Sequence, residues 1–270
     1  EILRCLVGSE MCIRDSHNTI YSIIRTGDNQ IYVGTYNGLC RYIASNGKFE
    51  KIPLPVNSSQ SNLFVNSLLE DTGRQCIWIG TEGYLFQYFP STGQMKQTEA
   101  FHNNSIKSLA LDGNGDLLAG TDNGLYVYHN DVTPLQHIIH DSRNIQSLTN
   151  NIIWNIFADQ EHNIWLGTDY GISLSRYNSA LQFIPISQIT GTGDGNQFYS
   201  LFRDSKGFYW FGGTNGLIRF TDPAGDKHNA IWYRMGDKTY PLSHNRIRHI
   251  YEDKEQQLWI ATDGSINRYD

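Results

Sequence analysis

The chain has 270 residues, enough to bury a sizeable core in one domain. Its formal net charge is −6 and only 18% of its residues are charged, which argues against a nucleic-acid-binding surface. No run approaches the ~18 apolar residues that a membrane span needs. Aromatic content of 13% and 25 glycines fit many short strands joined by turns.

The first 16 residues differ from everything that follows. They lack the turn residues of the later chain, and Gly8, Ser9 and Glu10 interrupt the apolar run that a signal peptide would need. The stretch from Cys5 to Asp15 resembles a leader that recurs at the ends of assembled environmental sequences. We therefore expect residues 1–16 to be a non-native leader that packs poorly, and residues 17–270 to be the folded part.

From residue 17 onward one short motif recurs six times. A strand-like run ends at Gly-Thr or a close variant, as in Trp165-Leu166-Gly167-Thr168. The glycine position is occupied in turn by Gly34, Gly80, Gly120, Gly167, Gly212 and Ala261. Successive copies thus lie 40 to 49 residues apart, and a period of this length is typical of repeat architectures.

Each copy contains three strand-like runs and a looser fourth. The first run alternates apolar and polar residues, the second holds an aromatic or large apolar residue, and Asp, Asn and Gly mark the turns. Short antiparallel strands without helical periodicity predict an all-β fold, a β-propeller of four-stranded antiparallel blades. We expect the aromatic residue to fill the wedge between blades, and the glycine after it to admit the backbone of the next blade.

In chain order, the blades are predicted to start near residues 18, 62, 104, 151, 196 and 245. Polar linkers precede the fourth and fifth copies, at 141–149 and 191–195. The sixth copy stops at Asp270, directly after its third run. Because an unclosed propeller exposes strand edges, we expect an incomplete last blade and a truncated fragment of a larger array.

The consensus Ser-Ile/Leu-x-x-Asp-x-x-Gly-x-Ile/Leu-Trp-Ile-Gly-Thr-x-x-Gly-Leu-x-x-Tyr resembles the two-component regulator propeller repeat. The segments 200–212 and 249–262 match it closely, and the linkers at 141–151 and 240–245 resemble the connectors of that family. The resemblance covers residues 17–270. Tyr84 and Ser265 at the turn glycine, Ala261 at the strand glycine and Gly213 at the threonine depart from the pattern, as local turn adjustments.

The resemblance implies the ligand-sensing part of a bacterial hybrid histidine kinase, of a kind found in Bacteroidetes-like bacteria. Such sensors respond to glycan fragments and regulate polysaccharide utilisation, so the implied location of this part is the periplasm. The implied partners are an oligosaccharide ligand, the remainder of the sensor kinase and a second copy of the chain, with no nucleic acid and no cofactor. Two alternatives stay open: a propeller enzyme acting on polysaccharide, as a lyase or glycosidase, and a protein-interaction scaffold.

When the six copies are aligned, each position of the first strand forms a column of six residues. One column varies in residue type, while the columns on either side of it do not. The flanking columns are apolar and are expected to be core: Ile20, Val65, Ile106, Ile153, Phe198 and Ile247 on one side, and Ile23, Leu68, Leu109, Ile156, Leu201 and Ile250 on the other. Between them lie Tyr21, Asn66, Lys107, Trp154, Tyr199 and Arg248. First strands line the channel of a propeller, so this column is the candidate ligand site, suited to an acidic or hydroxyl-rich oligosaccharide. The alternative is that these side chains fill the channel edge without a ligand.

Three other motifs give weaker evidence of a binding site. The loop 191–195 lacks the lysine and the helix of a phosphate site, which favours an inter-blade loop. The spacing of Asp112, Asn114 and Asp116 begins like a calcium loop but lacks the bidentate glutamate, so a hairpin turn is expected. His137, His140 and Asp141 fall short of a four-ligand zinc site. No metal site and no catalytic residue are therefore predicted.

Two further sets have structural interpretations. Four aspartates recur at the first turn of their copies and are expected to form turns rather than a catalytic carboxylate pair: Asp112, Asp159, Asp204 and Asp253. Cys40 and Cys76 lie in strands of neighbouring copies and are expected to be buried thiols. A disulfide between them is the open alternative.

Overall fold

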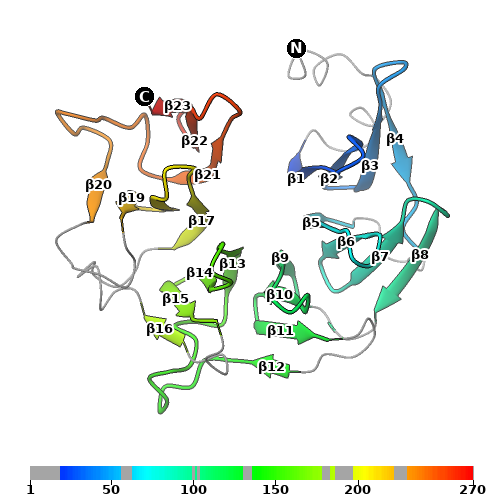
Figure 1. Ribbon diagram of the computed structural model, residues 1–270, viewed down its shortest axis with the longest axis horizontal. Coiled ribbons are helices and arrows are strands. Elements are labelled where there is room, and N and C mark those ends of the chain that lie inside the picture. The colour runs from blue at the N-terminus through cyan, green and yellow to red at the C-terminus, as the bar shows by residue number, and fades with distance from the viewer. Residues whose placement is uncertain are drawn as a thin grey trace. The chain divides into compact units, whose positions relative to one another are not determined.

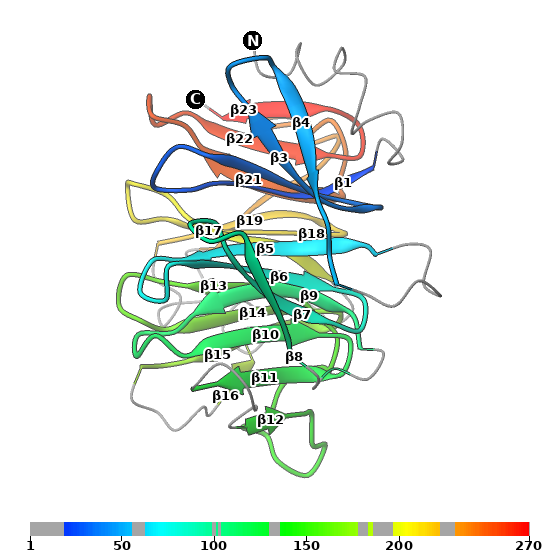
Figure 2. The same ribbon diagram turned by 90° about the vertical axis from the view of Figure 1, so that its right-hand side faces the viewer.

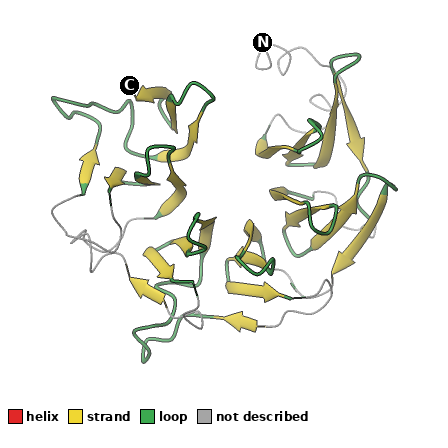
Figure 3. Cartoon of the chain, viewed as in Figure 1, coloured by secondary structure: helices red, strands yellow, loops and turns green. Residues whose placement is uncertain are grey.

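The structure is a computed structural model that describes residues 19–55, 63–98, 101, 104–129, 136–177, 183–185, 197–221 and 230–269. Within these ranges every regular element is a β-strand (Figure 3). None of the described residues forms a helix of the length and apolar character that crossing a membrane requires. The expected leader at 1–16 and the loop 191–195 lie outside the described residues.

The strands form six antiparallel sheets that follow one another along the chain (Figure 1). The first two sheets are β1 (Ile20–Arg25), β2 (Ile31–Thr35), β3 (Gly38–Ile43) and β4 (Lys48–Ile52), then β5 (Val65–Asp71), β6 (Cys76–Thr81), β7 (Leu85–Phe89) and β8 (Gln94–Thr98). The next two are β9 (Ile106–Leu111), β10 (Leu117–Thr121), β11 (Gly124–Tyr128) and β12 (Gln136–Ile138), then β13 (Ile153–Ala158), β14 (Ile164–Thr168), β15 (Gly171–Ser175) and β16 (Phe183–Pro185). The last two are β17 (Phe198–Arg203), β18 (Tyr209–Gly213), β19 (Gly216–Phe220) and β20 (Ile231–Tyr233), then β21 (Ile247–Glu252), β22 (Leu258–Thr262) and β23 (Ile266–Tyr269).

Each sheet is a meander in which consecutive strands pair, and each is a blade of a β-propeller. Five sheets have four strands, and the sixth has three within the described residues. The strands twist along each sheet, so that β4 runs steeply across β1 in Figure 2. The predicted all-β fold with six propeller repeats is therefore confirmed.

The chain divides into two compact units, which we describe separately. Unit 1 comprises residues 1–109 and 128–135 and contains the first two sheets. Unit 2 comprises residues 110–127 and 136–270 and contains the last three sheets. The third sheet contributes residues to both units.

Apolar side chains between successive sheets form the core of each unit. In unit 1, Tyr32 and Leu39 of the first sheet pack with Val65, Leu68 and other residues of the second. In unit 2, the sheet of β13–β16 packs on that of β17–β20 through a cluster that joins Trp165 to Phe198 and Phe211. The first strands of neighbouring sheets lie in contact, β1 with β5 in unit 1 and β13 with β17 with β21 in unit 2.

The glycine that ends the second strand admits the next sheet, as predicted. A Cβ atom at Gly167 would lie 2.6 Å from the carbonyl oxygen of Phe198, and one at Gly34 would lie 2.6 Å from that of Val65. Contacts this short do not occur in real structures, so a side chain here would force the first strand of the next sheet away. The absence of a side chain at this position of the motif thus permits the close approach of successive blades.

The residues of the two predicted core columns are buried, except for those of the first sheet in unit 1. Val65, Ile106, Ile153, Phe198 and Ile247 are buried, and so are Leu68, Leu109, Ile156, Leu201 and Ile250. Ile20 and Ile23 are instead 39% and 55% exposed, which corrects their assignment to the core. They belong to β1, and none of the described residues of unit 1 forms a sheet that precedes this strand.

The turn aspartates have a second function that turn chemistry alone did not reveal. Asp159 accepts the backbone N–H groups of Glu161 and Asn163 with Oδ1, and the indole N–H of Trp165 with Oδ2 at 2.8 Å. The same bond joins Asp71 to Trp78 at 3.1 Å, Asp204 to Trp210 at 2.8 Å and Asp253 to Trp259 at 2.6 Å. One carboxylate therefore shapes the turn and satisfies the polar atom of the aromatic wedge.

Candidate ligand-binding face

The variable column of the first strands coincides with a break in strand pairing. In five sheets the register between the first and second strands shifts around one residue, which is Tyr21, Asn66, Trp154, Tyr199 or Arg248. A β-bulge leaves one residue outside the ladder and turns its side chain away from the neighbouring pairs. The ladder therefore places little demand on this position, and its side chain is available for another purpose.

In unit 2 the bulge residues of neighbouring sheets meet. The rings of Trp154 and Tyr199 lie edge to face, with centroids 5.3 Å apart and planes at 76°. The indole N–H of Trp154 donates to Oδ1 of Asp169 at 3.0 Å. Trp154 and Tyr199 are both partly buried, so the pair is held in place while part of its surface remains accessible.

Asp169 connects the two sheets. The Nε2 group of Gln197, which directly precedes β17, donates to the same Oδ1 at 2.6 Å. The hydroxyl of Tyr199 in turn donates to Oε1 of Gln197. A continuous hydrogen-bonded path therefore runs from Trp154 through Asp169 and Gln197 to Tyr199.

Arg248 continues this arrangement on the next sheet. Its guanidinium lies over the ring of Tyr199, 5.7 Å from the centroid. Nε and a terminal nitrogen donate to the two carboxylate oxygens of Asp263, at 2.5 and 3.2 Å. Arg246 lies 3.6 Å from the same carboxylate. We call the set Trp154, Asp169, Gln197, Tyr199, Arg248 and Asp263 the unit 2 face.

The unit 2 face contains one ion pair, between Arg248 and Asp263. The hydrogen bond to Asp263 raises the pKa of Arg248, and the hydrogen bond from Arg248 lowers the pKa of Asp263. Asp169 is the second carboxylate of the face, and it accepts from the neutral donors of Trp154 and Gln197. The face thus offers hydrogen-bond donors and acceptors beside aromatic surface, and its arginine is already paired.

Unit 1 has a separate aromatic group at the corresponding position. The ring of Phe64 lies edge to face with Tyr36, with centroids 4.2 Å apart, and with Tyr21 at 6.2 Å. Tyr21 is 47% exposed, and its partial burial, followed by the charge of Glu82, raises its pKa. In the next sheet, Asn66 donates to the hydroxyl of Ser105 at 3.1 Å. Lys107 lies partly buried on β9.

The structure therefore brings together three of the six predicted site residues, Trp154, Tyr199 and Arg248, in unit 2. It places Tyr21 and Asn66 in unit 1, where each contacts other partners. The sequence reasoning missed the residues that hold this column, chiefly Asp169, Gln197 and Asp263 in unit 2, and Tyr36 and Phe64 in unit 1.

A second variable column would have revealed some of them. It directly follows the threonine or Gly213 at the end of the second strand and contains Tyr36, Glu82, Asp122, Asp169, Thr214 and Asp263. Its backbone is fixed to the residue before the first strand, since the N–H groups of Asp169 and Asp263 donate to the carbonyls of Ile152 and Arg246 at 2.9 and 3.2 Å. Constant backbone geometry with changing side chains is the same signal that marked the bulge column.

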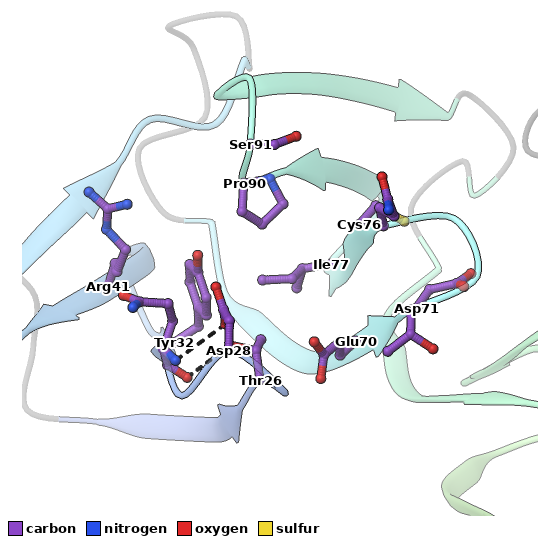
Figure 4. A pocket seen from close by; sticks show the side chains of 13 residues that line it. Thr26, Asp28, Tyr32, Arg41, Glu70, Asp71, Cys76, Ile77, Pro90 and Ser91 are labelled. Atoms are coloured by element: carbon purple, nitrogen blue, oxygen red, sulfur yellow. Dashed lines mark hydrogen bonds between the residues drawn. The ribbon is translucent and has the colours of Figure 1, made fainter.

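A cavity of about 620 Å³ opens in unit 1 near the turn between β1 and β2 (Figure 4). Its lining includes Asp28, Tyr32, Arg41, Glu70 and Cys76. The carboxylates already serve the fold, because Glu70 accepts the N–H of Gly27 at 3.0 Å and Asp28 accepts the hydroxyl of Thr26 at 2.5 Å. The guanidinium of Arg41 is paired with Glu50 at 2.7 Å. None of the predicted site residues lines this cavity.

The weaker motifs behave as parts of turns and connectors. Oδ1 of Asp112 accepts the N–H groups of Asn114 and Asp116, both at 2.8 Å, which is the geometry of a hairpin turn. The rings of His137 and His140 bind different backbone carbonyls, those of Asn123 and Leu148. Cys40 and Cys76 are both buried thiols outside any disulfide, so the disulfide alternative is not realised.

Comparison with known proteins identifies the repeat. Residues 147–170, 192–215 and 241–264 match the two component regulator propeller family. The extracellular domain of the putative hybrid two component system BT4673 from B. thetaiotaomicron is 95% identical, with a TM-score of 0.58. The match covers 94% of this chain and 34% of that chain.

Two further proteins extend the comparison. Histidine kinase P4 of Formosa agariphila is 27% identical over 283 residues, which is 95% of this chain and 19% of the kinase. The chain thus spans about a fifth of that kinase and a third of the B. thetaiotaomicron chain. Virginiamycin B lyase from Staphylococcus aureus, 13% identical with a TM-score of 0.67 over 96% of this chain and 86% of the lyase, shares the fold alone.

Proposed function

This chain belongs to the two-component regulator propeller family, and from that premise we propose that it is the ligand-sensing part of a bacterial hybrid histidine kinase. Its ligand is a glycan fragment, and the parent protein regulates polysaccharide utilisation. The observation that carries the proposal is the unit 2 face, where bulge residues from successive sheets form one aromatic and polar surface.

The chemistry of the face favours a hydroxyl-rich ligand over an acidic one. A sugar ring can place its apolar face on Trp154 or Tyr199, while its hydroxyls both donate and accept hydrogen bonds. An anionic ligand would need a basic group that is not already neutralised, but the guanidinium of Arg248 is paired with Asp263. We therefore propose a neutral oligosaccharide as the ligand.

The relatives support an extracytoplasmic location. The domain of the B. thetaiotaomicron system is described as extracellular, and this chain is 95% identical to it over the part compared. We propose that the chain lies in the periplasm and acts on the kinase part of its parent protein. A second copy of the chain is a further proposed partner, since kinases of two-component systems signal between subunits.

The test is a calorimetric titration of the chain with soluble tetrasaccharides. The panel contains cellotetraose, xylotetraose and mannotetraose as neutral probes and tetragalacturonate as an acidic one, and each mixture is afterwards analysed for cleavage products. Saturable binding of a neutral probe without products is the expected result. Release of products would favour the lyase or glycosidase alternative, and absence of binding to every probe would favour the scaffold.

A further inference from the structure

We call the interface between two neighbouring sheets a seam. Three seams share one arrangement. The bulge residue of one sheet, or the residue in its second turn, contacts the residue that precedes the first strand of the next sheet. In unit 1 the contacts are Tyr21 and Tyr36 with Phe64, and Asn66 and Glu82 with Ser105. In unit 2 Asp169 contacts Gln197, and the same carboxylate oxygen accepts the indole N–H of Trp154. The residue before the first strand is therefore a regular part of the surface that carries the bulge column.

We propose that Asp169 and Gln197 are the positioning residues of the ligand-binding face in unit 2. This inference rests on the proposed ligand-sensing function and identifies the groups that set the geometry of its site. Asp169 fixes the indole of Trp154, and Gln197 fixes the hydroxyl of Tyr199 while bound to the same carboxylate. The two aromatic rings come from different sheets, so their mutual angle depends on this link across the seam.

The bonding explains why these two residue types are needed. A carboxylate oxygen has two lone pairs and can accept the indole and the amide donors together. An amide side chain can donate to the carboxylate with Nε2 and accept from the tyrosine hydroxyl with Oε1. Hydrogen bonds to charged groups contribute more than neutral ones, so the link is strong for a surface that remains partly accessible.

The first test needs no ligand. The indole N–H resonance of Trp154, assigned with Trp154→Phe, is followed by ¹H–¹⁵N NMR in Gln197→Leu. We expect it to shift, because the carboxylate oxygen that accepts it loses its second donor from the neighbouring sheet. The indole resonances of Trp165 and Trp210 should stay in place, and Gln160→Leu, an exposed position in the same unit, should move none of them.

The second test measures binding of the neutral tetrasaccharide that the wild-type chain binds most tightly. Gln197→Leu and Asp169→Leu should each weaken its affinity by about tenfold to a hundredfold, the range expected for losing hydrogen bonds to a charged group. Asp169→Asn keeps an acceptor oxygen for both donors but loses the charge, so it should weaken the affinity less than Asp169→Leu does. Gln160→Leu should stay within about threefold of wild type. Thermal unfolding of every variant is recorded, so that a loss of binding is compared only between folded proteins.

The outcomes separate this inference from the proposed function. Failure of Gln197→Leu to move the Trp154 resonance would overturn the positioning role, whatever the chain binds. A shifted resonance with unchanged tetrasaccharide affinity would overturn it too, while leaving the ligand-sensing function in place. A wild-type chain that binds none of the tetrasaccharides would overturn the proposed function, and Asp169 and Gln197 would then be purely structural.

Discussion

At the scale of single residues, the aspartate–tryptophan pairs connect turn formation to the core. Asp204 and Trp210 lie six positions apart, and their bond closes the first hairpin of the sheet from within. Where the aromatic is absent, as at Leu118, Asp112 still accepts turn N–H groups. The sequence reveals the turn function of these aspartates because the turn is local. The indole bond was missed because it depends on how the hairpin folds back.

Removing the indole N–H should be costly where the pair is buried. Trp210 is 1% exposed, whereas Trp259 is 37% exposed. Trp210→Phe leaves a carboxylate oxygen of Asp204 without its donor, and we expect it to lower the free energy of unfolding by about 1–3 kcal/mol. Trp259→Phe should have a smaller effect. Urea unfolding followed by circular dichroism provides the comparison, and equal losses would contradict the burial argument.

The pair in the second sheet predicts a dependence on pH. Burial opposes ionisation of Asp71, but the N–H of Arg74, the indole of Trp78 and the guanidinium of Arg74 together lower the pKa of the carboxyl group. An acid whose pKa is lower in the folded state stabilises the fold above its unfolded pKa, ~3.9, and this stabilisation is lost as pH falls through the folded pKa. We therefore expect stability to decrease below about pH 4, and the decrease to be shallower in Asp71→Asn. Parallel profiles for the two proteins in urea titrations would refute this assignment.

At the scale of elements, the repeated hairpin determines the strands of each blade and also the bulge that leaves one residue of the first strand outside the ladder. The glycine period and the alternation of the first strands depend on neighbours in the sequence and in the next repeat, so the fold could be predicted. The bulge could not, because an interruption of the register is a property of two paired strands. It appeared in the sequence only as unexplained variation between two constant apolar columns.

The close approach of successive sheets predicts a specific sensitivity at the strand glycines. Gly167→Ala places a Cβ atom 2.6 Å from the backbone oxygen of Phe198, which only a movement of β17 can relieve. We expect a loss of about 1–3 kcal/mol in the free energy of unfolding, as for overpacked cores. The control is Gly27→Ala, whose Cβ would lie 3.7 Å from Glu70, an ordinary contact. Similar stabilities of the two variants would show that the interface between the two sheets accommodates the added Cβ atom, and would contradict this prediction.

At the scale of the whole molecule, six repeats of one hairpin pattern carry different side chains at one position. This explains why the family could be recognised from the repeat, while only three residues of the unit 2 face were predicted. Trp154, Tyr199 and Arg248 were predicted as members of a column, but the sequence could not rank them above Tyr21, Asn66 and Lys107. Their grouping depends on contacts with Asp169, Gln197 and Asp263, which lie in turns and connectors where no strand pattern applies.

The buried thiols report on the integrity of unit 1. Cys40 and Cys76 are each 2% exposed, and neither forms a disulfide. In a chain carrying Cys5→Ser and Cys12→Ser, we expect a thiol reagent to label these two cysteines only as fast as the protein opens. Labelling should therefore accelerate with added urea, and a reducing agent should leave the unfolding midpoint unchanged. Rapid labelling in native buffer would contradict the burial of these cysteines.

The most direct test of a ligand site on the unit 2 face is calorimetric titration of Trp154→Ala with the neutral tetrasaccharide that the wild-type chain binds. Tyr240→Ala, which removes an exposed aromatic ring outside this face, is the control. We expect Trp154→Ala to weaken binding by at least about tenfold, as for an aromatic residue at the centre of a contact, and Tyr240→Ala to leave it unchanged. Wild-type affinity in a folded Trp154→Ala protein would place the ligand site elsewhere and contradict this account.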